Sequence, residues 1–185
     1  MRFPVQVDQG VELRPFAPAD AEALFDLISR NRQRLDPWMR WTAPITTLEA
    51  TQQLIQRFTE RLANNDGFHV GLWVSGESGE ELAGGVACYA INPDSHYTEI
   101  GYWLGEEFVG RGLVTRACRL VISELFAHQG VHRIEIQAVT DNLPSRAVAE
   151  RLGFTFEGVR REFIWITDAY KDHALYSLLV HEWQP

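Results

Sequence analysis

Residues 100–115, IGYWLGEEFVGRGLVT, contain the end of a predicted strand, a glycine-containing loop and the start of a predicted helix. The helix is indicated by apolar residues at helical spacing: Val114, Ala117, Cys118, Val121 and Leu125. The first turn of a helix leaves backbone N–H groups unpaired and carries a partial positive charge, and glycines let an anion approach those groups. The stretch therefore predicts a pyrophosphate site, although a tight turn would also explain Gly110-Arg111-Gly112 taken alone.

Two common nucleotide-binding motifs do not fit this loop. A Walker A loop needs the pattern G-x-x-x-x-G-K-S/T, which the sequence lacks. The dinucleotide pattern G-x-G-x-x-G also fails, because Thr115 occupies the position of its last glycine. We therefore expect a pyrophosphate site outside both of these nucleotide-binding folds.

Outward from this stretch, alternating runs predict strands and amphipathic runs predict helices. The predicted strands cover residues 11–16, 68–74, 82–91, 98–104, 133–139, 154–157 and 174–180. The predicted helices follow Pro18, the capping box Thr46-Thr47-Leu48-Glu49, Gly112 and Pro144, and the turn Gly76-Glu77-Ser78-Gly79 predicts a hairpin. The order predicts one α/β (α+β) domain over residues 1–185, with a mixed central sheet of about seven strands flanked by about four helices.

Charge and cysteine content exclude several classes of protein. The net charge of −8 is a poor match for non-specific nucleic-acid binding, which needs a basic surface. Two cysteines, Cys88 and Cys118, form at most one bridge, so the chain is not a disulfide scaffold. The six histidines lack metal-ligand spacing, so no metal is expected. No apolar run approaches the ~20 residues of a membrane span and the first residues lack the apolar core of a signal peptide, so we expect a cytoplasmic protein.

Several motifs, in the same order, resemble the GNAT superfamily of acetyl-CoA-dependent N-acetyltransferases. Residues 99–104 resemble its fourth strand, and residues 109–115 resemble its pyrophosphate loop, usually written Gln/Arg-x-x-Gly-x-Gly/Ala. Asn142-Leu143-Pro144-Ser145 resembles the Asn-x-x-Ser after its fifth strand, and Gly153-Phe154 resembles its closing signature. The segments Leu35-Asp36-Pro37-Trp38-Met39-Arg40-Trp41 and 176–183 are similar to the ribosomal-protein N-acetyltransferase subgroup.

The sequence departs from the superfamily pattern at two places. Val109 stands where the loop usually has Gln or Arg, and Val114 stands where it has Gly or Ala. These changes are tolerable if backbone N–H groups make the contacts. Some relatives also carry an acid just before the aromatic residue matched by Trp165, whereas this chain has Ile164 there and Glu162 nearby. The identity of a general base is therefore open.

The resemblance implies acetyl-CoA as the co-substrate. The residues that it implies for acetyl-CoA binding are Trp103, Leu104, Gly105, Val109, Gly110, Arg111, Gly112, Leu113, Val114, Thr115 and Asn142. Asn142 is equally explained as a turn asparagine. Trp38, Met39 and Trp41 are expected either to line the acceptor pocket or to form a core cluster.

Acetyl transfer to an amine needs a neutral amine and a proton for the leaving thiolate. A terminal α-amine has a pKa of about 7.7–8.0, so a weak base suffices. Glu99, at the start of the strand, is the candidate base, or else a solvated carboxylate. Ser145 is the candidate proton donor, or else a helix-terminal serine that satisfies local N–H groups. Tyr102 is an alternative acid, although strand alternation favours a place in the core.

The leading hypothesis is an acetyl-CoA-dependent transferase that acetylates a protein N-terminus, as the ribosomal-protein subgroup does. One alternative keeps acetyl-CoA and takes a small amine, such as a polyamine, an amino acid or an aminoglycoside. Another is a non-catalytic acyl-CoA-binding module. The resemblance also implies a homodimer, and no nucleic-acid or membrane partner is expected.

Overall fold

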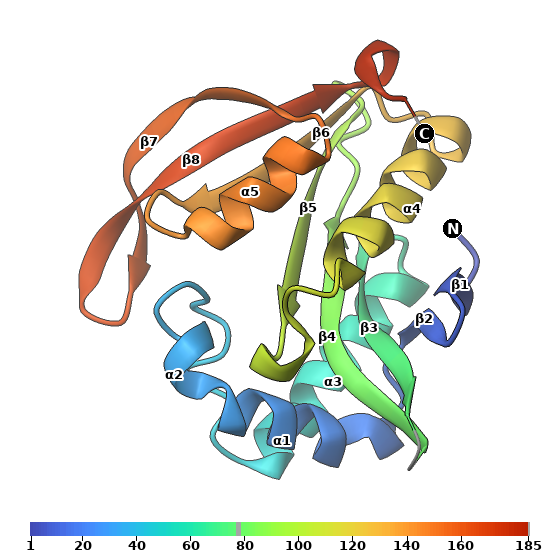
Figure 1. Cartoon of the computed structure of the whole chain (residues 1–185), viewed down its shortest axis with the longest axis vertical. Helices are drawn as coiled ribbons and strands as arrows, with labels where there is room; N and C mark the ends of the chain where they lie inside the picture. Colours follow the sequence, from blue (N-terminus) through green and yellow to red (C-terminus); the bar gives the residue numbers. More distant parts are fainter. Residues whose placement is uncertain (77–78, 185) are drawn as a thin grey trace.

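A single mixed sheet organises the chain, and the computed structural model describes residues 1–76 and 79–184 (Figure 1). The strands of the described residues are β1 (Val5–Asp8), β2 (Val11–Pro15), β3 (Gly67–Gly76), β4 (Gly79–Tyr89), β5 (Tyr97–Leu104), β6 (Arg133–Val139), β7 (Thr155–Ile166) and β8 (Ala169–Leu179). Their order is β1-β2-β3-β4-β5-β6-β8-β7. All neighbours are antiparallel except β5 and β6, which run parallel.

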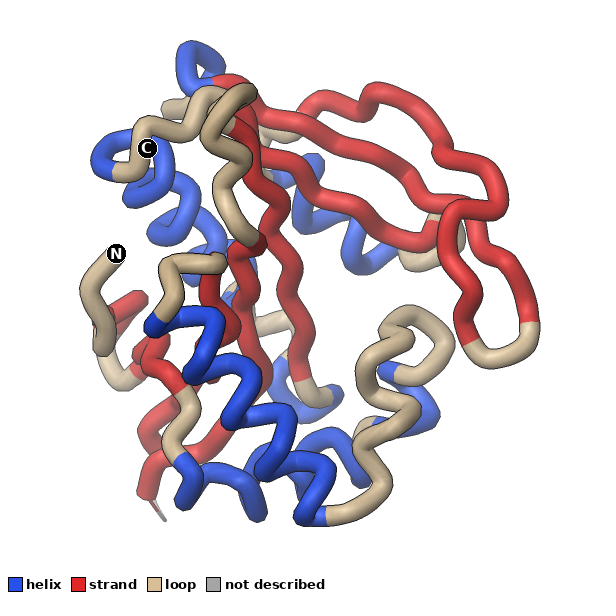
Figure 2. Tube along the Cα trace, turned by 180° about the vertical axis from the view of Figure 1, so that it is seen from behind, coloured by secondary structure: helices blue, strands red, loops and turns tan. Residues whose placement is uncertain are grey.

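Helices cover both faces of this sheet. The α-helices of the described residues are α1 (Ala21–Arg30), α2 (Arg32–Leu35), α3 (Leu48–Ala63), α4 (Leu113–His128) and α5 (Leu143–Arg151). Helices α4 and α5 lie in front of the strands in Figure 1, and α3 lies in front of them in the reverse view of Figure 2. Helix α1 contacts α3 and β4. None of the described helices is both long enough and apolar enough to cross a membrane.

The α/β class and the order of the predicted elements are confirmed, with three corrections. The described residues form eight strands and five α-helices rather than about seven and four, because β1 and the short α2 were not predicted. Strand β7 continues to Ile166 instead of ending at residue 157, and strand β8 begins at Ala169 instead of residue 174. The two strands therefore form a long hairpin. The N-cap of α3 is Thr47, whose side chain accepts from the Ala50 N–H at 3.1 Å, and not Thr46. Of the predicted turn, Glu77 and Ser78 lie outside the described residues.

The sheet opens between β5 and β6. Their pairing covers three residue pairs and ends at Glu99 opposite Glu135. From there β5 pairs with β4 as far as Leu104, while β6 pairs with β8 as far as Val139. The alternation of buried Ile134 and Ile136 with half-buried residues turns one face of β6 toward the core. The two strands therefore diverge where the sequence placed the candidate site.

Candidate functional site

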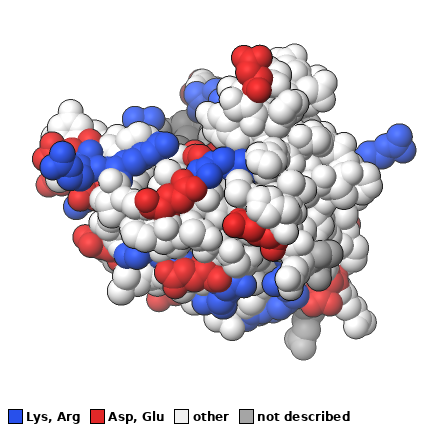
Figure 3. Space-filling view, turned by 90° about the horizontal axis from the view of Figure 1, so that it is seen from above, with Lys and Arg blue, Asp and Glu red and all other residues white. Residues whose placement is uncertain are grey.

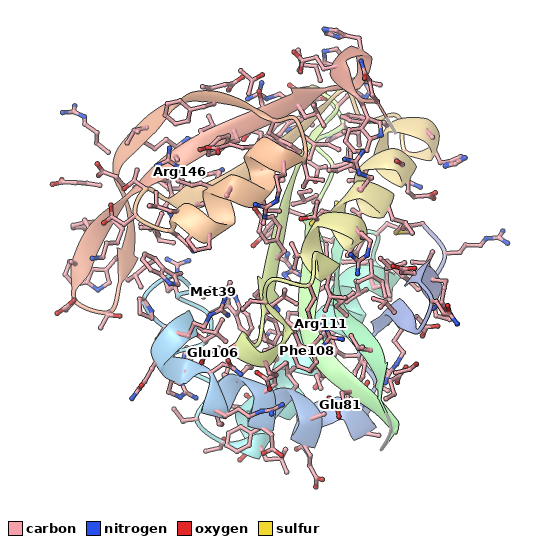
Figure 4. All side chains as sticks on the ribbon, viewed as in Figure 1. Met39, Glu81, Glu106, Phe108, Arg111 and Arg146 are labelled. Atoms are coloured by element: carbon pink, nitrogen blue, oxygen red, sulfur yellow. The ribbon has the colours of Figure 1, made fainter. Side chains whose placement is uncertain are left out.

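A cavity of about 460 Å³ lies where β5 ends and where α4 and α5 begin. Among the residues that the sequence singled out, its walls contain Trp38, Met39, Trp103, Leu104, Val109, Gly110, Gly112, Leu113, Val114, Thr115, Asn142 and Ser145. In Figure 4, Met39 lies between α2 and α5. The structure thus brings most of the predicted residues to one cavity.

The loop before α4 has the geometry expected of an anion site. Gly110 and Gly112 have φ angles of +75° and +70°, which L side chains rarely adopt, and Gly112 is the N-cap of α4. The N–H of Arg116 is bonded to the Gly112 carbonyl, so the N–H groups of the preceding helical residues have no partner within the helix. No acidic residue lies in this first turn.

The charge of the cavity also suits an anion. The charged residues among its described walls are Arg34 and Arg151, and no carboxylate is among them. This contrasts with the net charge of −8 of the chain and with the face seen in Figure 3, where acidic and basic side chains are interspersed. A diphosphate with a long uncharged arm, such as acetyl-CoA, fits these walls. Their cations and unpaired backbone N–H groups suit the diphosphate, and apolar side chains such as Trp38 and Val148 can pack against the arm.

Four of the predicted residues lie outside the cavity. Gly105 packs against α1, and its N–H donates to the Ala83 carbonyl at 2.9 Å. Arg111 is exposed. Trp41 packs edge-on against Trp103 with ring centroids 5.6 Å apart, so it supports the wall from behind. Glu99 is the fourth, and its surroundings are distinct.

Ser145 and Tyr102 place two hydroxyl groups on the cavity wall. The Asn142 side chain caps α5 by accepting the Ser145 N–H at 3.2 Å. The Tyr102 hydroxyl donates to the Ser145 carbonyl at 2.8 Å, and the Ser145 hydroxyl donates to the Tyr102 oxygen at 3.5 Å. Burial raises the pKa of Tyr102, so the phenol stays protonated. Tyr102 is half-buried and lines the cavity rather than lying in the core.

Glu99 lies at the point where β5 and β6 separate. Its Oε2 atom accepts from Nε2 of Gln137 at 2.9 Å. Burial raises the pKa of Glu99 to about 7, and the neighbouring charge of Glu135 adds to the rise, while Arg160 and the hydrogen bond from Gln137 oppose it. A carboxyl group with this pKa can exchange a proton near neutral pH.

Glu162 does not take the place of the acid that some relatives carry. It lies in the irregular stretch of β7 between Arg160 and Ile164, with φ of +51°. Its side chain is exposed, and its N–H donates to the Asp172 carboxylate at 2.7 Å. Ile164 itself faces Lys171 of β8.

Sequence reasoning missed several residues of the cavity. Pro144, Val148 and Arg151 line it at the spacing of one helix face, so the helical period of α5 could have indicated them once Ser145 was chosen. Arg34 and Leu35 line it from α2, which carried no recognised pattern.

The described residues contain no group of three His, Cys, Asp or Glu placed to hold a metal ion.

The corner between α1 and α2 is bonded to the segment that leads from β5 to the glycine loop. The Asn31 side chain, 4% exposed, accepts the Glu106 N–H at 2.7 Å and donates to the Leu27 carbonyl at 3.0 Å. Arg34 donates to the Leu104 carbonyl at 2.6 Å. In Figure 4, Glu106 lies at the lower end of β5, next to these helices. One corner therefore adjoins both the loop and the aromatic residues after α2.

Comparisons with known proteins agree with this arrangement. The family described as acetyltransferase (GNAT) domain matches residues 11–155. A protein of Bacillus subtilis (strain 168), provisionally named a ribosomal N-acetyltransferase, is 33% identical over 183 residues, which cover 98% of each chain.

Two solved structures show the same fold, one in complex with acetyl-CoA and the other with coenzyme A. A microcin C7 self-immunity acetyltransferase in complex with acetyl-CoA and AMP superposes with a TM-score of 0.89 at 28% identity, over 95% of this chain and 96% of that one. A ribosomal L7/L12 alpha-N-protein acetyltransferase in complex with coenzyme A has a TM-score of 0.89 at 25% identity, over 96% of this chain and 98% of that one.

Proposed function

Because the chain belongs to the GNAT family of acetyl-CoA-dependent N-acetyltransferases, we propose that its acceptor is the N-terminal α-amine of a protein, such as a ribosomal protein. The observation that carries this choice is the similarity over 98% of both chains to a relative named for ribosomal N-acetylation. The L7/L12 acetyltransferase, which matches nearly end to end, supports the same class of acceptor.

Acetyl-CoA would bind in the cavity at the start of α4. The free N–H groups of Leu113, Val114 and Thr115 would hold the pyrophosphate, and Arg34 and Arg151 would add positive charge at the walls. The stretch of β5 after Glu99, which pairs with no strand of the described residues on its β6 side, would receive the extended arm. The apolar walls at Trp38 and Met39 would exclude water from the reacting groups.

In the proposed reaction the amine nitrogen bonds to the acetyl carbon and the carbon–sulfur bond breaks. Glu99 takes the proton that the amine loses, directly or through a water molecule, which its pKa of about 7 allows near neutral pH. Ser145 or Tyr102 donates a proton to the thiolate, since both hydroxyls line the cavity. An α-amine suits this machinery because its own pKa of about 7.7–8.0 leaves part of it neutral.

The proposal is tested by incubating the protein with acetyl-CoA and a panel of acceptors while free thiol is measured. The panel contains peptides that begin with Ser, Ala, Met or Thr, together with spermidine, free amino acids and an aminoglycoside. We expect thiol release with one class of peptide, and a loss of about 10²-fold or more in kcat for Glu99→Gln. Release with small amines alone would refute the N-terminal acceptor.

A small amine is the second candidate acceptor, and one observation favours it. The microcin C7 self-immunity acetyltransferase matches the fold as well as the L7/L12 enzyme does, and its structure is a complex with acetyl-CoA and AMP. Adenine nucleotides that carry a primary amine therefore belong in the panel, and thiol release with them but with no peptide would select this alternative.

The setting of the activity belongs to the same proposal. Residues 1–185 would act as one N-acetyltransferase domain in the cytoplasm, where both described cysteines, Cys88 and Cys118, stay free and buried. A homodimer is supported by strand β7, which ends the sheet and exposes Phe163 and Trp165 by about half. Light scattering at several concentrations would test the dimer.

A further inference from the structure

Three side chains from three different strands form a continuous chain of hydrogen bonds on one face of the sheet. Arg160 of β7 donates from Nη1 to Oε1 of Gln137 on β6 at 3.2 Å, and Gln137 donates from Nε2 to Oε2 of Glu99 on β5 at 2.9 Å. Strand β8 lies between β7 and β6, so the Arg160 side chain reaches across it. We call these three residues the relay.

The relay lies on the face of the sheet away from α5. Tyr176 of β8 bonds to Arg146 and Glu150 of α5, and Tyr176 pairs with Ile136 of β6. Because successive side chains of a strand point to opposite faces, Gln137 points away from α5. The relay therefore approaches the opening between β5 and β6 from the side opposite the one that carries Ser145.

The partners of Gln137 fix the direction of its amide. A guanidinium group only donates hydrogen bonds, so the amide oxygen must face Arg160. The NH₂ group then faces Glu99 and can only donate, which favours the charged form of that carboxylate. The second oxygen of Glu99, Oε1, has no hydrogen-bond partner among residues 1–76 and 79–184, so it is left to accept a proton.

Charges around Glu99 act in opposite directions. Burial and Glu135, the paired residue on β6, raise its pKa, and Arg160 and Gln137 lower it, with the net value at about 7. From β4, Tyr89 also faces Glu99, and burial and that carboxylate both raise the pKa of its phenol, so it stays neutral. Loss of the relay would leave burial and Glu135 without opposition, and the pKa of Glu99 would rise further.

We propose that Gln137 and Arg160 are positioning residues for acetyl transfer: Arg160 orients the Gln137 amide, and Gln137 holds the Glu99 carboxylate charged with its other oxygen free. The inference rests on the proposed role of Glu99 as the base. It assigns this role to two residues that no motif of the sequence indicated.

The test is the pH dependence of kcat/KM with an N-terminal peptide, measured for the wild type, Arg160→Leu, Arg160→Lys and Gln137→Leu. The matched control is Arg161→Leu, which removes an exposed arginine from the next position of β7. The titration of the peptide amine is common to all enzymes, so differences between their profiles report on the protein.

We expect Arg160→Leu to move the acid limb up by about one pH unit, which lowers the rate about tenfold at pH 6 and leaves it within about twofold at pH 9. Gln137→Leu keeps the charge of Arg160, so we expect a smaller shift of the acid limb in the same direction. This shift should lower the rate about threefold at pH 6. Arg160→Lys should restore part of the loss, and Arg161→Leu should superimpose on the wild type.

A second measurement reports on Glu99 without activity. The ¹³C signal of its carboxyl group, assigned by its disappearance in Glu99→Gln, should titrate near pH 7 in the wild type and higher in Arg160→Leu. If the titration midpoint of Glu99 and the acid limb of kcat/KM are both unchanged in Arg160→Leu and Gln137→Leu, the role of the relay is refuted, while Glu99 stays the proposed base. Full activity of Glu99→Gln would instead refute the proposed base, whatever the carboxyl midpoints are.

Discussion

The corner at Asn31 allows a quantitative test of how the glycine loop is held. Replacing Asn31 by Ala removes the acceptor of the Glu106 N–H and the donor to the Leu27 carbonyl, at 2.7 and 3.0 Å. Asn31 is 4% exposed, so water cannot readily replace these bonds. We expect the change to weaken both the fold and acetyl-CoA binding.

The magnitude follows from the two bonds. A buried polar group left without a partner costs about 1–3 kcal/mol, so the two together reduce the free energy of unfolding by about 3 kcal/mol. For a chain of this length 1 kcal/mol shifts Tm by roughly 2–4 °C, which gives a drop of about 6–12 °C. If about half of the lost free energy, ~1.4 kcal/mol, lowers the population of the native loop, the Kd for CoA rises about tenfold.

The assay combines thermal melting with calorimetric titration of CoA. The control is Arg30→Ala at the same corner, which removes the ion pair with Glu107 at 2.7 Å. Both partners are solvent-exposed, so the control should cost about 0–1 kcal/mol and change the Kd by less than about twofold. An Asn31→Ala protein that melts lower yet binds CoA with wild-type affinity would refute the link between this corner and the loop.

Three more outcomes follow from single contacts. In steady-state assays at pH 8, Ser145→Ala should lower kcat by about tenfold. Adding Tyr102→Phe should lower kcat further, because the two hydroxyls lie 3.5 Å apart and either could donate the proton. Equal rates for the single and double variants would exclude Tyr102 as a proton donor. Gly112→Ala places a side chain at φ of +70°, so chemical denaturation should show a loss of about 1–2 kcal/mol and the KM for acetyl-CoA should rise. Arg133 lowers the pKa of Glu157 to about 2, so the Tm deficit of Glu157→Gln should be full above pH 4.5 and shrink as the pH falls toward 2; a deficit independent of pH would contradict this.

The sequence was a good guide where periodicity was strong and local. Strand β6 begins at Arg133 and ends at Val139 as predicted, because Ile134, Ile136 and Ala138 alternate with polar residues and face the core. Strand β1 was missed because its four residues pair only with β2 and are at most half-buried. The far end of β7 was missed because the bulge near Glu162 interrupts the alternation.

The candidate site was predictable only in part, for a physical reason. The glycine loop is a contiguous segment, so local geometry indicates its chemistry. The contact of Gln137 with Glu99 depends on the parallel pairing of β5 and β6, and that of Arg160 depends on β7 lying outside β8. Such neighbours follow from the order of strands in the sheet, which a motif does not encode. The roles of Glu99 and Ser145 stay predictions until the variants are measured.

The narrow join between β5 and β6 also has a mechanical consequence. Three residue pairs, the last at Glu99 and Glu135, connect the β1–β5 half of the sheet to the β6–β8 half. We expect a join of this width to let the two halves of the sheet twist relative to each other. A bound molecule that forms hydrogen bonds along the free edge of β5 and also contacts α5 would connect the two halves of the sheet and limit their relative motion. The stiffness of the enzyme then depends on whether the CoA site is occupied. Hydrogen exchange in β6 should therefore slow when CoA is bound.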